Sequence, residues 1–425
     1  MIFFNKITQN QLFKIVSLNS FSVGLKIGIG LIMSKVFAIF IGPIGMALIG
    51  NLRIFLTSLE TISILGFQNG IVKYVAENYK DKEKIKNIIV SVFISLLVII
   101  FILSGLLYFF ADFWNDNIFG NDFEYSFVFK FLALALPWYA ISVFLLAILN
   151  GLSKFKKVIW VNIIGNLIGL VISVLMVLQF KVFGALLAII ITPALLFFVT
   201  FYFVRKEIDL LGIIKLNLFD FQIIKKLSSY SLMALISSVL GPFVFLAIRT
   251  NVIQNLGLVQ VGYWEAMTRI STYYLMFVST ILTVYYLPKL AIAQNSKETK
   301  KVFWSFYKSI LPVFCLGLFI IYFSRFFIIQ ILFTKEFLPV SSLFFWQLLG
   351  DFFKVASLIL GYQFFAKKLT KAFVFFELSS FVLLYFLTYI FMKLFGLEGV
   401  VMAQAIDNLL YFISLSIYFR KIFLV

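Results

Sequence analysis

The chain contains no histidine and a single cysteine among its 425 residues. The absence of histidine excludes histidine-ligated metal sites, imidazole-based catalytic triads and histidine proton relays. One cysteine cannot form an internal disulfide, and the position of Cys315 within an apolar run favours packing over redox chemistry. The sequence also lacks a phosphate-binding loop of the form GxxxxGK[ST], so ATP hydrolysis is not expected to drive its activity.

Charged residues are scarce as well, at 13% of the chain, whereas 63% of the residues are hydrophobic and 56 are phenylalanine. A soluble domain could not bury so much apolar surface, so we predict an integral membrane protein. The formal net charge of +18 does not indicate nucleic-acid binding, because the basic residues lie in short loops between apolar runs. No nucleic-acid partner, metal or cofactor is expected.

Apolar stretches of about 20 residues, bounded by charges or turn signals, predict an all-α fold with about twelve transmembrane helices. The first run, from about Gln11 to Ile41, is too long for a secretory signal and has no small-residue cleavage site, so we predict an uncleaved first span. The predicted spans are 12–41, 44–72, 86–111, 126–150, 157–179, 182–204, 227–249, 258–287, 303–323, 340–366, 371–392 and 397–419.

The loops between these spans differ in charge. Loops on one side carry most of the lysines and arginines, whereas the other side has only Lys181, Arg325, Lys335 and Lys393. The positive-inside rule therefore predicts that both termini are cytoplasmic. The longest outer loop, 112–125, carries four acids and no lysine, as expected for the opposite side.

The two halves of the chain show a weak repeat. A shift of 217 residues lays Gly45 on Gly262, and a shift of 215 lays Gly184 on Gly399. Because each half holds six predicted spans, the halves start on the same side of the membrane and are parallel. We predict an N-terminal lobe, 1–204, and a C-terminal lobe, 227–425. The cytoplasmic linker between them, 205–226, alternates apolar and charged residues and is expected to lie along the membrane surface.

Several charged residues lie inside the predicted spans, where a charge costs about 2.5–3.5 kcal/mol at the bilayer centre. Four of them are within about two turns of a span end and are expected to snorkel to the surface: Lys130, Arg249, Lys308 and Glu377. The deeper charges are Lys26, Lys35, Arg53, Glu60, Glu265, Arg269, Asp351, Lys354 and Asp407.

Three pairs of these deep charges share one helix face and could neutralise themselves: Arg53 with Glu60, Glu265 with Arg269, and Asp351 with Lys354. Lys26 has no acid on its own helix, and the nine-residue spacing puts Lys35 on the opposite face. We favour Lys26 for a cavity position because it is deeper. A water-lined functional cavity and structural pairing between helices both remain open, and we favour the cavity.

With histidine absent, any site for a proton or a sodium ion must be a carboxylate. Asp351 and Asp407 lie at mid-depth in the C-terminal half and are candidates, because burial disfavours their charged form. The alternative is that Asp351 neutralises Lys354 and that Asp407 neutralises a cation on a neighbouring helix. Gly241-Pro242 is the candidate hinge, with a static proline kink as the alternative.

One stretch of the sequence resembles a known family. The residues Gly42-Pro43-x-Gly45, Gly50-Asn51 and Asn69-Gly70-x-Val72-Lys73-Tyr74-Val75-Ala76 resemble the second helix of the O-antigen (lipid-linked oligosaccharide) flippases. These flippases form the polysaccharide-transporter branch of the multidrug/oligosaccharidyl-lipid/polysaccharide (MOP) exporters. The resemblance implies two six-helix lobes around a central cavity lined by spans 1, 2, 7 and 8, with alternating access.

The resemblance also implies the cargo and its binding residues. The expected substrate is an undecaprenyl-diphosphate-linked oligosaccharide, moved from the cytoplasmic to the periplasmic leaflet of a bacterial inner membrane. In related lipid II flippases an arginine cluster on spans 1, 2 and 8 is thought to hold the diphosphate, and the matching positions here are Lys26, Arg53 and Arg269. A lysine loses bidentate binding but keeps a point charge for phosphate. Membrane lipids, a polysaccharide polymerase and a chain-length regulator are the other expected partners.

Two other functions agree less well with the sequence. An ion-coupled drug or cation antiporter of the same superfamily would be expected to have a cavity dominated by acids, whereas the unpaired excess here is basic. A membrane glycan polymerase or ligase would usually offer a large outer loop with clustered acids or histidines, and the loop 112–125 has only scattered acids. We therefore expect a transporter and not an enzyme, driven by an ion gradient or the membrane potential.

Overall fold

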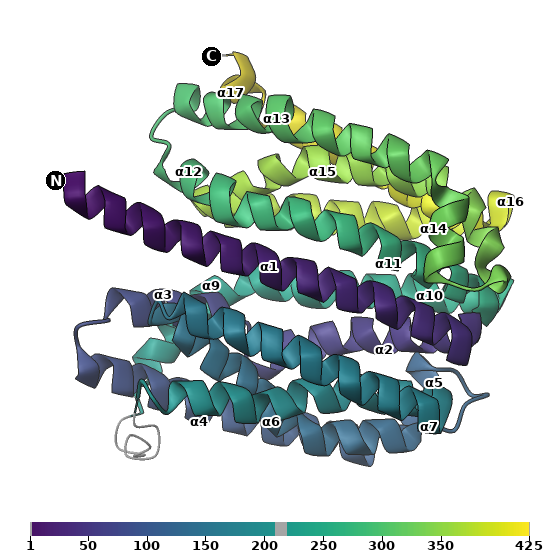
Figure 1. Cartoon of the computed structure of the whole chain (residues 1–425), viewed down its shortest axis with the longest axis horizontal. Coiled ribbons are helices and arrows are strands. Elements are labelled where there is room, and N and C mark those ends of the chain that lie inside the picture. Colours follow the sequence, from purple (N-terminus) through teal and green to yellow (C-terminus); the bar gives the residue numbers. More distant parts are fainter. Residues whose placement is uncertain (1, 209–218, 425) are drawn as a thin grey trace. The chain divides into compact units, whose positions relative to one another are not determined.

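The computed structural model describes residues 2–208 and 219–424, and this part of the chain is helical without any strand (Figure 1). The elements are α1 (Ile2–Phe40), α2 (Gly42–Ser63), α3 (Gln68–Glu77), α4 (Lys82–Phe109), α5 (Ala111–Ile118), α6 (Ser126–Gly151), α7 (Phe155–Val204), α9 (Phe221–Leu235), η2 (Ile236–Leu240), α10 (Gly241–Leu256), α11 (Leu258–Ile281), η3 (Leu282–Tyr286), α12 (Leu287–Ile292), α13 (Ser296–Phe323), α14 (Arg325–Leu332), η4 (Lys335–Leu343), α15 (Phe344–Lys367), α16 (Thr370–Tyr418) and α17 (Arg420–Leu424).

Ten helical segments of the described chain are long and apolar enough to cross a membrane. Two of them, α7 and α16, have 50 and 49 residues, about twice the length that one crossing needs. Each is interrupted by one residue with non-helical backbone, Lys181 in α7 and Gly396 in α16. Counting these two helices twice gives twelve spans, which confirms the predicted all-α, multi-span membrane fold.

The reversals inside α7 and α16 are alike in detail. Lys181 has φ 49° and ψ −124°, and Gly396, which is 215 residues later, has φ 60° and ψ −137°. Three residues after each turn stands a glycine, Gly184 or Gly399, whose missing side chain lets the returning helix touch the preceding one. A Cβ atom there would lie 2.0 Å from the carbonyl oxygen of Met176 or Phe391. The sequence repeat therefore corresponds to a shared turn geometry.

The chain divides into two compact units. The first contains residues up to Val36 and Asn51–Phe243, and the second contains Phe37–Gly50 and Val244–Val425. The end of α1 and the start of α2 thus group with the second unit, although the sequence prediction placed them in the lobe 1–204. The predicted lobe boundaries remain a prediction. Residues 209–218 of the predicted linker, where the surface helix was expected, lie outside the described residues.

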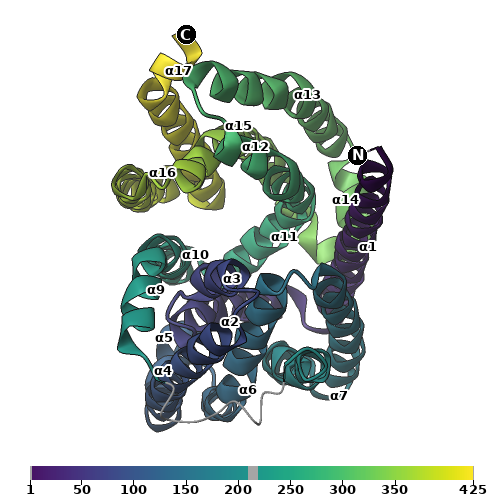
Figure 2. The same cartoon turned by 90° about the vertical axis from the view of Figure 1, so that its left-hand side faces the viewer.

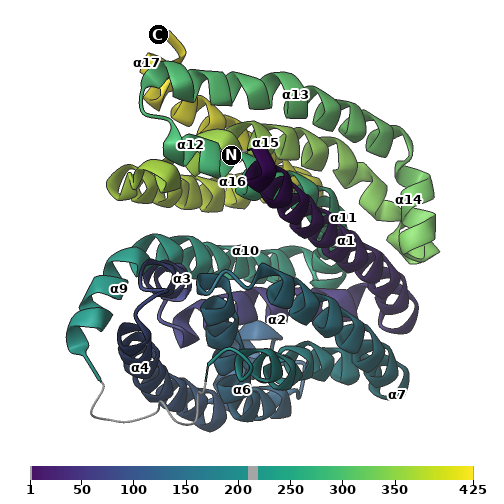
Figure 3. The same cartoon turned by 60° about the vertical axis from the view of Figure 1, so that its left-hand side comes forward.

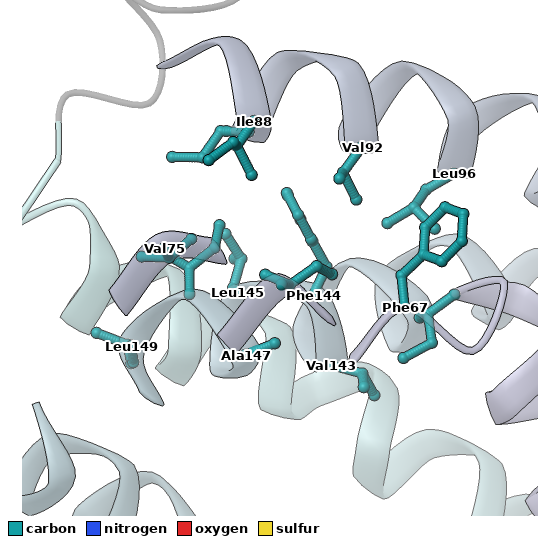
Figure 4. Close-up of a cluster of buried hydrophobic side chains, with 14 of the residues drawn as sticks. Phe67, Val75, Ile88, Val92, Leu96, Val143, Phe144, Leu145, Ala147 and Leu149 are labelled. Carbon is teal, nitrogen blue, oxygen red and sulfur yellow. The ribbon is translucent and has the colours of Figure 1, made fainter. Parts of the chain in front are cut away.

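Helix α6 is central to the first unit, because it packs against α3, α4, α5 and α7. Figure 4 shows part of its apolar core, where Ile88, Val92 and Leu96 project from one face of α4 toward Phe144 of α6. Lipid tails are as apolar as these side chains, so close van der Waals packing holds the helices together. Glycine makes two of the approaches possible: a Cβ at Gly70 would lie 2.7 Å from Leu227, and one at Gly151 would lie 2.7 Å from Val75.

In the second unit, α15 packs along α16 (Figure 2) and also against α13 (Figure 3). Gly350 of α15 permits the first contact, since a Cβ there would lie 3.0 Å from the Cα atom of Ala405 in α16. Helix α15 also packs against α11 and α12. Helix α15 is therefore in contact with α11, α12, α13 and α16. Most of the buried polar residues of the second unit lie on α15 and on these helices.

The Gly241-Pro242 pair follows a π-helical turn, η2, and begins α10. Proline lacks the N–H group that would continue the hydrogen-bond ladder, so such a turn is a common local consequence. The division between the compact units also falls within α10, directly after Phe243. A hinge at Gly241-Pro242 remains a prediction, and these two features support it.

Candidate functional site

The three cations expected to hold a phosphate belong to different units. Lys26 of α1 and Arg53 of α2 lie in the first unit and are exposed. Arg269 of α11 lies in the second unit and is only 4% exposed. Lys35, the alternative to Lys26, is half-buried. A joint phosphate site made of Lys26, Arg53 and Arg269 therefore remains a prediction.

Arg269 belongs to a buried network of three charges. Arg249 of α10 donates from Nη1 to Oε2 of Glu265 at 3.1 Å, and Arg269 donates from Nε to the other oxygen, Oε1, at 3.1 Å. The exposed fractions of Arg249, Glu265 and Arg269 are 3%, 5% and 4%. The predicted Glu265–Arg269 pair is confirmed, and a second arginine shares its carboxylate. We call these three residues the arginine–glutamate triad.

The start of α2 is packed against the triad. Arg249 donates from Nη2 to the backbone oxygen of Ala47 at 3.2 Å. A Cβ atom at Gly50 would lie 2.3 Å from Oε2 of Glu265, so the helix can approach the carboxylate only because Gly50 has no side chain. The guanidinium of Arg269 lies 5.0 Å from the ring centre of Phe37, at the end of α1. Gly50, one of the residues that carry the family resemblance, thus has a direct structural role.

The prediction that Arg249 snorkels to the membrane surface is wrong. It placed the end of the seventh span at residue 249, but α10 runs from Gly241 to Leu256 and stops before Gly257, which has φ 88°. Arg249 is therefore in the middle of the helix and is held there by Glu265. The glycine after Leu256 was the available signal for this later end. Lys130 and Lys308 are exposed, whereas Glu377 is half-buried and accepts a hydrogen bond from Tyr411.

Glu60 does not neutralise Arg53. Among the described residues no ion pair joins them, and Glu60 instead accepts a hydrogen bond from the hydroxyl of Tyr139 on α6. Seven residues correspond to a rise of about 10 Å along a helix, which a direct contact does not easily span. Tyr139 was missed by sequence reasoning because a hydroxyl in an apolar helix carries no charge signal.

Asp351 of α15 is buried, with 2% of its surface exposed, and it is surrounded by hydrogen-bond donors. Ser271 donates at 2.6 Å, Tyr274 donates to the same oxygen, and the amide of Gln347 lies 3.2 Å from both oxygens. Lys354 is exposed and forms no direct ion pair with Asp351 among the described residues, so it acts on Asp351 only through a longer-range electrostatic interaction. The carboxylate of Asp351 points toward α11, whereas the ammonium group of Lys354, three residues later, does not contact this carboxylate.

Asp407 of α16 is buried as well, at 6% exposure, but it has fewer partners. Ser380 donates to Oδ2 at 2.8 Å, whereas Oδ1 is buried without a hydrogen-bond partner within the described residues. The alternative in which Asp407 neutralises a cation on a neighbouring helix is not observed for this part of the chain. Nor do the described residues contain a cluster of three or more metal-ligating side chains.

Comparisons with known proteins give consistent results. A family model described as "Polysaccharide biosynthesis protein" matches residues 12–291. Proteins named Lipid III flippase from Escherichia coli (strain K12) and Shigella flexneri are each 28% identical over 389 residues, which cover 91% of this chain and 93% of the relative.

Solved structures with the same fold come from transporters. An inward-facing multidrug resistance MATE family transporter of the MOP superfamily superimposes with a TM-score of 0.78 at 15% identity, covering 94% of this chain and 93% of that chain. The lipid II flippase MurJ, in an inward closed conformation, gives 0.73 at 18% identity, covering 96% of this chain and 89% of that chain. At these identities the structures establish the fold of the chain.

Proposed function

Because the chain belongs to the polysaccharide biosynthesis protein family, we propose that it is a flippase for lipid-linked saccharide precursors. More specifically, the substrate would be an undecaprenyl-diphosphate-linked oligosaccharide, such as an O-antigen repeat unit. It would be moved from the cytoplasmic to the periplasmic leaflet of a bacterial inner membrane. The observation that carries the proposal is the near full-length similarity to the Lipid III flippases.

The charges within the helices support an anionic substrate. The arginine–glutamate triad carries a net charge of +1 in a buried position, and Lys26 and Arg53 add two exposed cations. Cations at membrane depth are expensive and usually mark a substrate or ion pathway. We assign Lys26, Arg53 and Arg269 to the diphosphate headgroup, because guanidinium and ammonium groups can replace the hydration of phosphate oxygens.

Transport would be driven by an ion gradient or the membrane potential. Of the two candidate carboxylates, Asp407 suits a coupling role better, because one of its oxygens is buried without a partner in the described chain. Asp351 already accepts hydrogen bonds from three side chains and suits a structural role. We expect Asp407→Asn to abolish gradient-dependent transport and Asp351→Asn to retain part of it. If both variants retain gradient-dependent transport equally, the coupling would instead involve Glu60 or the membrane potential acting directly on the anionic headgroup.

A drug or cation antiporter is the second candidate, because the fold is also that of a MATE transporter. The two functions separate in proteoliposomes. Wild-type protein should move a fluorescent undecaprenyl-diphosphate oligosaccharide between leaflets and should not accumulate a cationic dye such as ethidium. Dye transport without lipid transport would favour the antiporter. The similarity to named flippases and transporters agrees with the expectation that the chain is not an enzyme.

The orientation in the membrane is part of the proposal. With both termini in the cytoplasm, the loop 112–125 would be periplasmic. Single cysteines in a Cys315→Ser background should react with an impermeant maleimide from outside at Asn117, and not at Lys82 or Lys300. The reverse pattern would invert the direction of transport. A polysaccharide polymerase and a chain-length regulator are proposed as partners on the periplasmic side.

A further inference from the structure

The arginine–glutamate triad contains a buried hydrogen-bond donor that its own residues do not satisfy. Glu265 uses one carboxylate oxygen for each arginine. Nη2 of Arg269 is buried and has no hydrogen-bond partner among the described residues. The three side chains together keep a charge of +1 although each is at least 95% buried. An unpartnered guanidinium nitrogen of this kind requires an explanation, because leaving it unsatisfied has a free-energy cost.

Stability does not supply that explanation. The desolvation of buried charges commonly offsets their mutual attraction, so well-packed apolar residues would often serve the fold as well. The buried Nη2 of Arg269 becomes satisfied if a second anion enters, because the anion can accept a hydrogen bond from it.

The chemistry of the two arginines indicates which anion could replace Glu265. The carboxylate of Glu265 offers two oxygens to two guanidinium groups, as two oxygens of a phosphate would. Arginine binds carboxylate and phosphate with the same planar fork. A phosphate that approaches Arg249 and Arg269 therefore competes with Glu265 for the same donors.

We propose that Glu265 is a built-in competitor for the anionic headgroup. It holds Arg249 and Arg269 while no substrate is bound and yields them to phosphate oxygens when the substrate enters. The inference rests on the proposed flippase function, and it adds Arg249 to the binding residues. A competitor of this kind keeps the affinity moderate, so that a substrate bound strongly enough to be selected can also be released.

The exchange would also affect α2. Arg249 donates to the backbone oxygen of Ala47, and Gly50 lies against Glu265. When Arg249 turns to a phosphate, the start of α2 loses this hydrogen bond. Binding would thereby weaken the attachment of residues 37–50 within the second unit.

The test measures binding of undecaprenyl diphosphate to the full-length protein in detergent. Glu265→Gln removes the competing charge but keeps an amide oxygen for one arginine, so we expect about tenfold tighter binding. Transport at saturating substrate should become slower, because release is slowed. Glu124→Gln is the control, since Glu124 is exposed between α5 and α6, and the affinity of this variant should equal that of wild type. Binding of uncharged undecaprenol should not change in any variant.

Unchanged or weaker binding by a folded Glu265→Gln protein would overturn the inference. If this variant does not fold, Arg249→Gln is compared with Arg249→Gln/Glu265→Gln. The double variant keeps the net charge of the triad and frees Arg269, and we expect about tenfold tighter binding than in the single variant. Equal affinities would again contradict the inference. Failure of the proposed function looks different, because wild type would then bind undecaprenyl diphosphate no better than undecaprenol.

Discussion

The two units of the chain hold their intramembrane charges in opposite ways. In the first unit Lys26 and Arg53 are exposed, and the half-buried Glu60 has a tyrosine as its partner. In the second unit Lys354 is exposed too, but the triad, Asp351 and Asp407 are buried and hydrogen-bonded. A buried charge depends on its partners, whereas an exposed one does not. Substitutions of the buried charges in the second unit should therefore lower the stability most, whereas substitutions of the exposed cations in the first unit should affect transport with little loss of stability.

The largest effect is expected from Glu265→Leu. This change removes the carboxylate that accepts hydrogen bonds from Arg249 and Arg269, and removing one partner of a buried ion pair costs about 3–5 kcal/mol. The melting temperature in detergent and the yield of folded protein should fall sharply.

The matched variant in the first unit is Glu60→Leu, which removes one hydrogen bond from Tyr139 and leaves no buried charge unpaired. The free energy of unfolding of this variant should fall by about 1–3 kcal/mol. Equal losses in the two variants would contradict the difference between the units.

A smaller effect is expected from Gly262→Ala. A Cβ atom at Gly262 would lie 2.1 Å from the backbone oxygen of Pro43, so α11 and the start of α2 must separate. Overpacking of this kind costs about 1–3 kcal/mol. Gly24→Ala in α1 is the control, because a Cβ there meets nothing within 4 Å. A control variant that loses as much stability as Gly262→Ala would show that the close approach is unimportant.

The smallest effect concerns an ion-pair cluster outside the spans. Hydrogen bonds from Lys157 and Lys154 lower the pKa of Glu207 from its usual 4.5. Because the folded pKa is the lower one, the stabilisation is complete above pH 4.5 and is lost as the pH falls through the folded value. Lys154 is 39% exposed, so solvent screening limits the contribution to below about 1 kcal/mol.

Melting temperatures of wild type and Glu207→Gln, measured between pH 7 and pH 3, check this expectation. The two proteins should differ at pH 7 and converge in acid. A difference that grows toward low pH would mean that the sign is wrong.

The spans were predictable from sequence because length and hydropathy alone define a membrane crossing. The partners of the buried charges were not. Asp351 is satisfied by Ser271 and Tyr274, about 80 residues earlier in the chain, and no local spacing indicates such a contact. Arg249 was misplaced because its helix continues seven residues further than the hydropathy suggested.

The family resemblance located residues whose physical role the sequence did not reveal. Gly50 makes room for Glu265, and its neighbour Asn51 donates to the backbone oxygen of Ile118 at 2.8 Å in the first unit. Gly70 makes room for Leu227 in the same unit. A motif of spaced glycines therefore marks close approaches between helices that lie far apart in sequence.

The most direct test of the account is the flipping of a fluorescent undecaprenyl-diphosphate oligosaccharide in proteoliposomes that carry an ion gradient. Wild-type protein should move the lipid between leaflets, and Arg53→Ala should lose this activity while its melting temperature stays within a few degrees of wild type, because Arg53 is exposed. Flipping by Arg53→Ala at the wild-type rate would contradict the assignment of the phosphate-binding cations. Wild-type flipping no faster than in protein-free liposomes would contradict the proposed function itself.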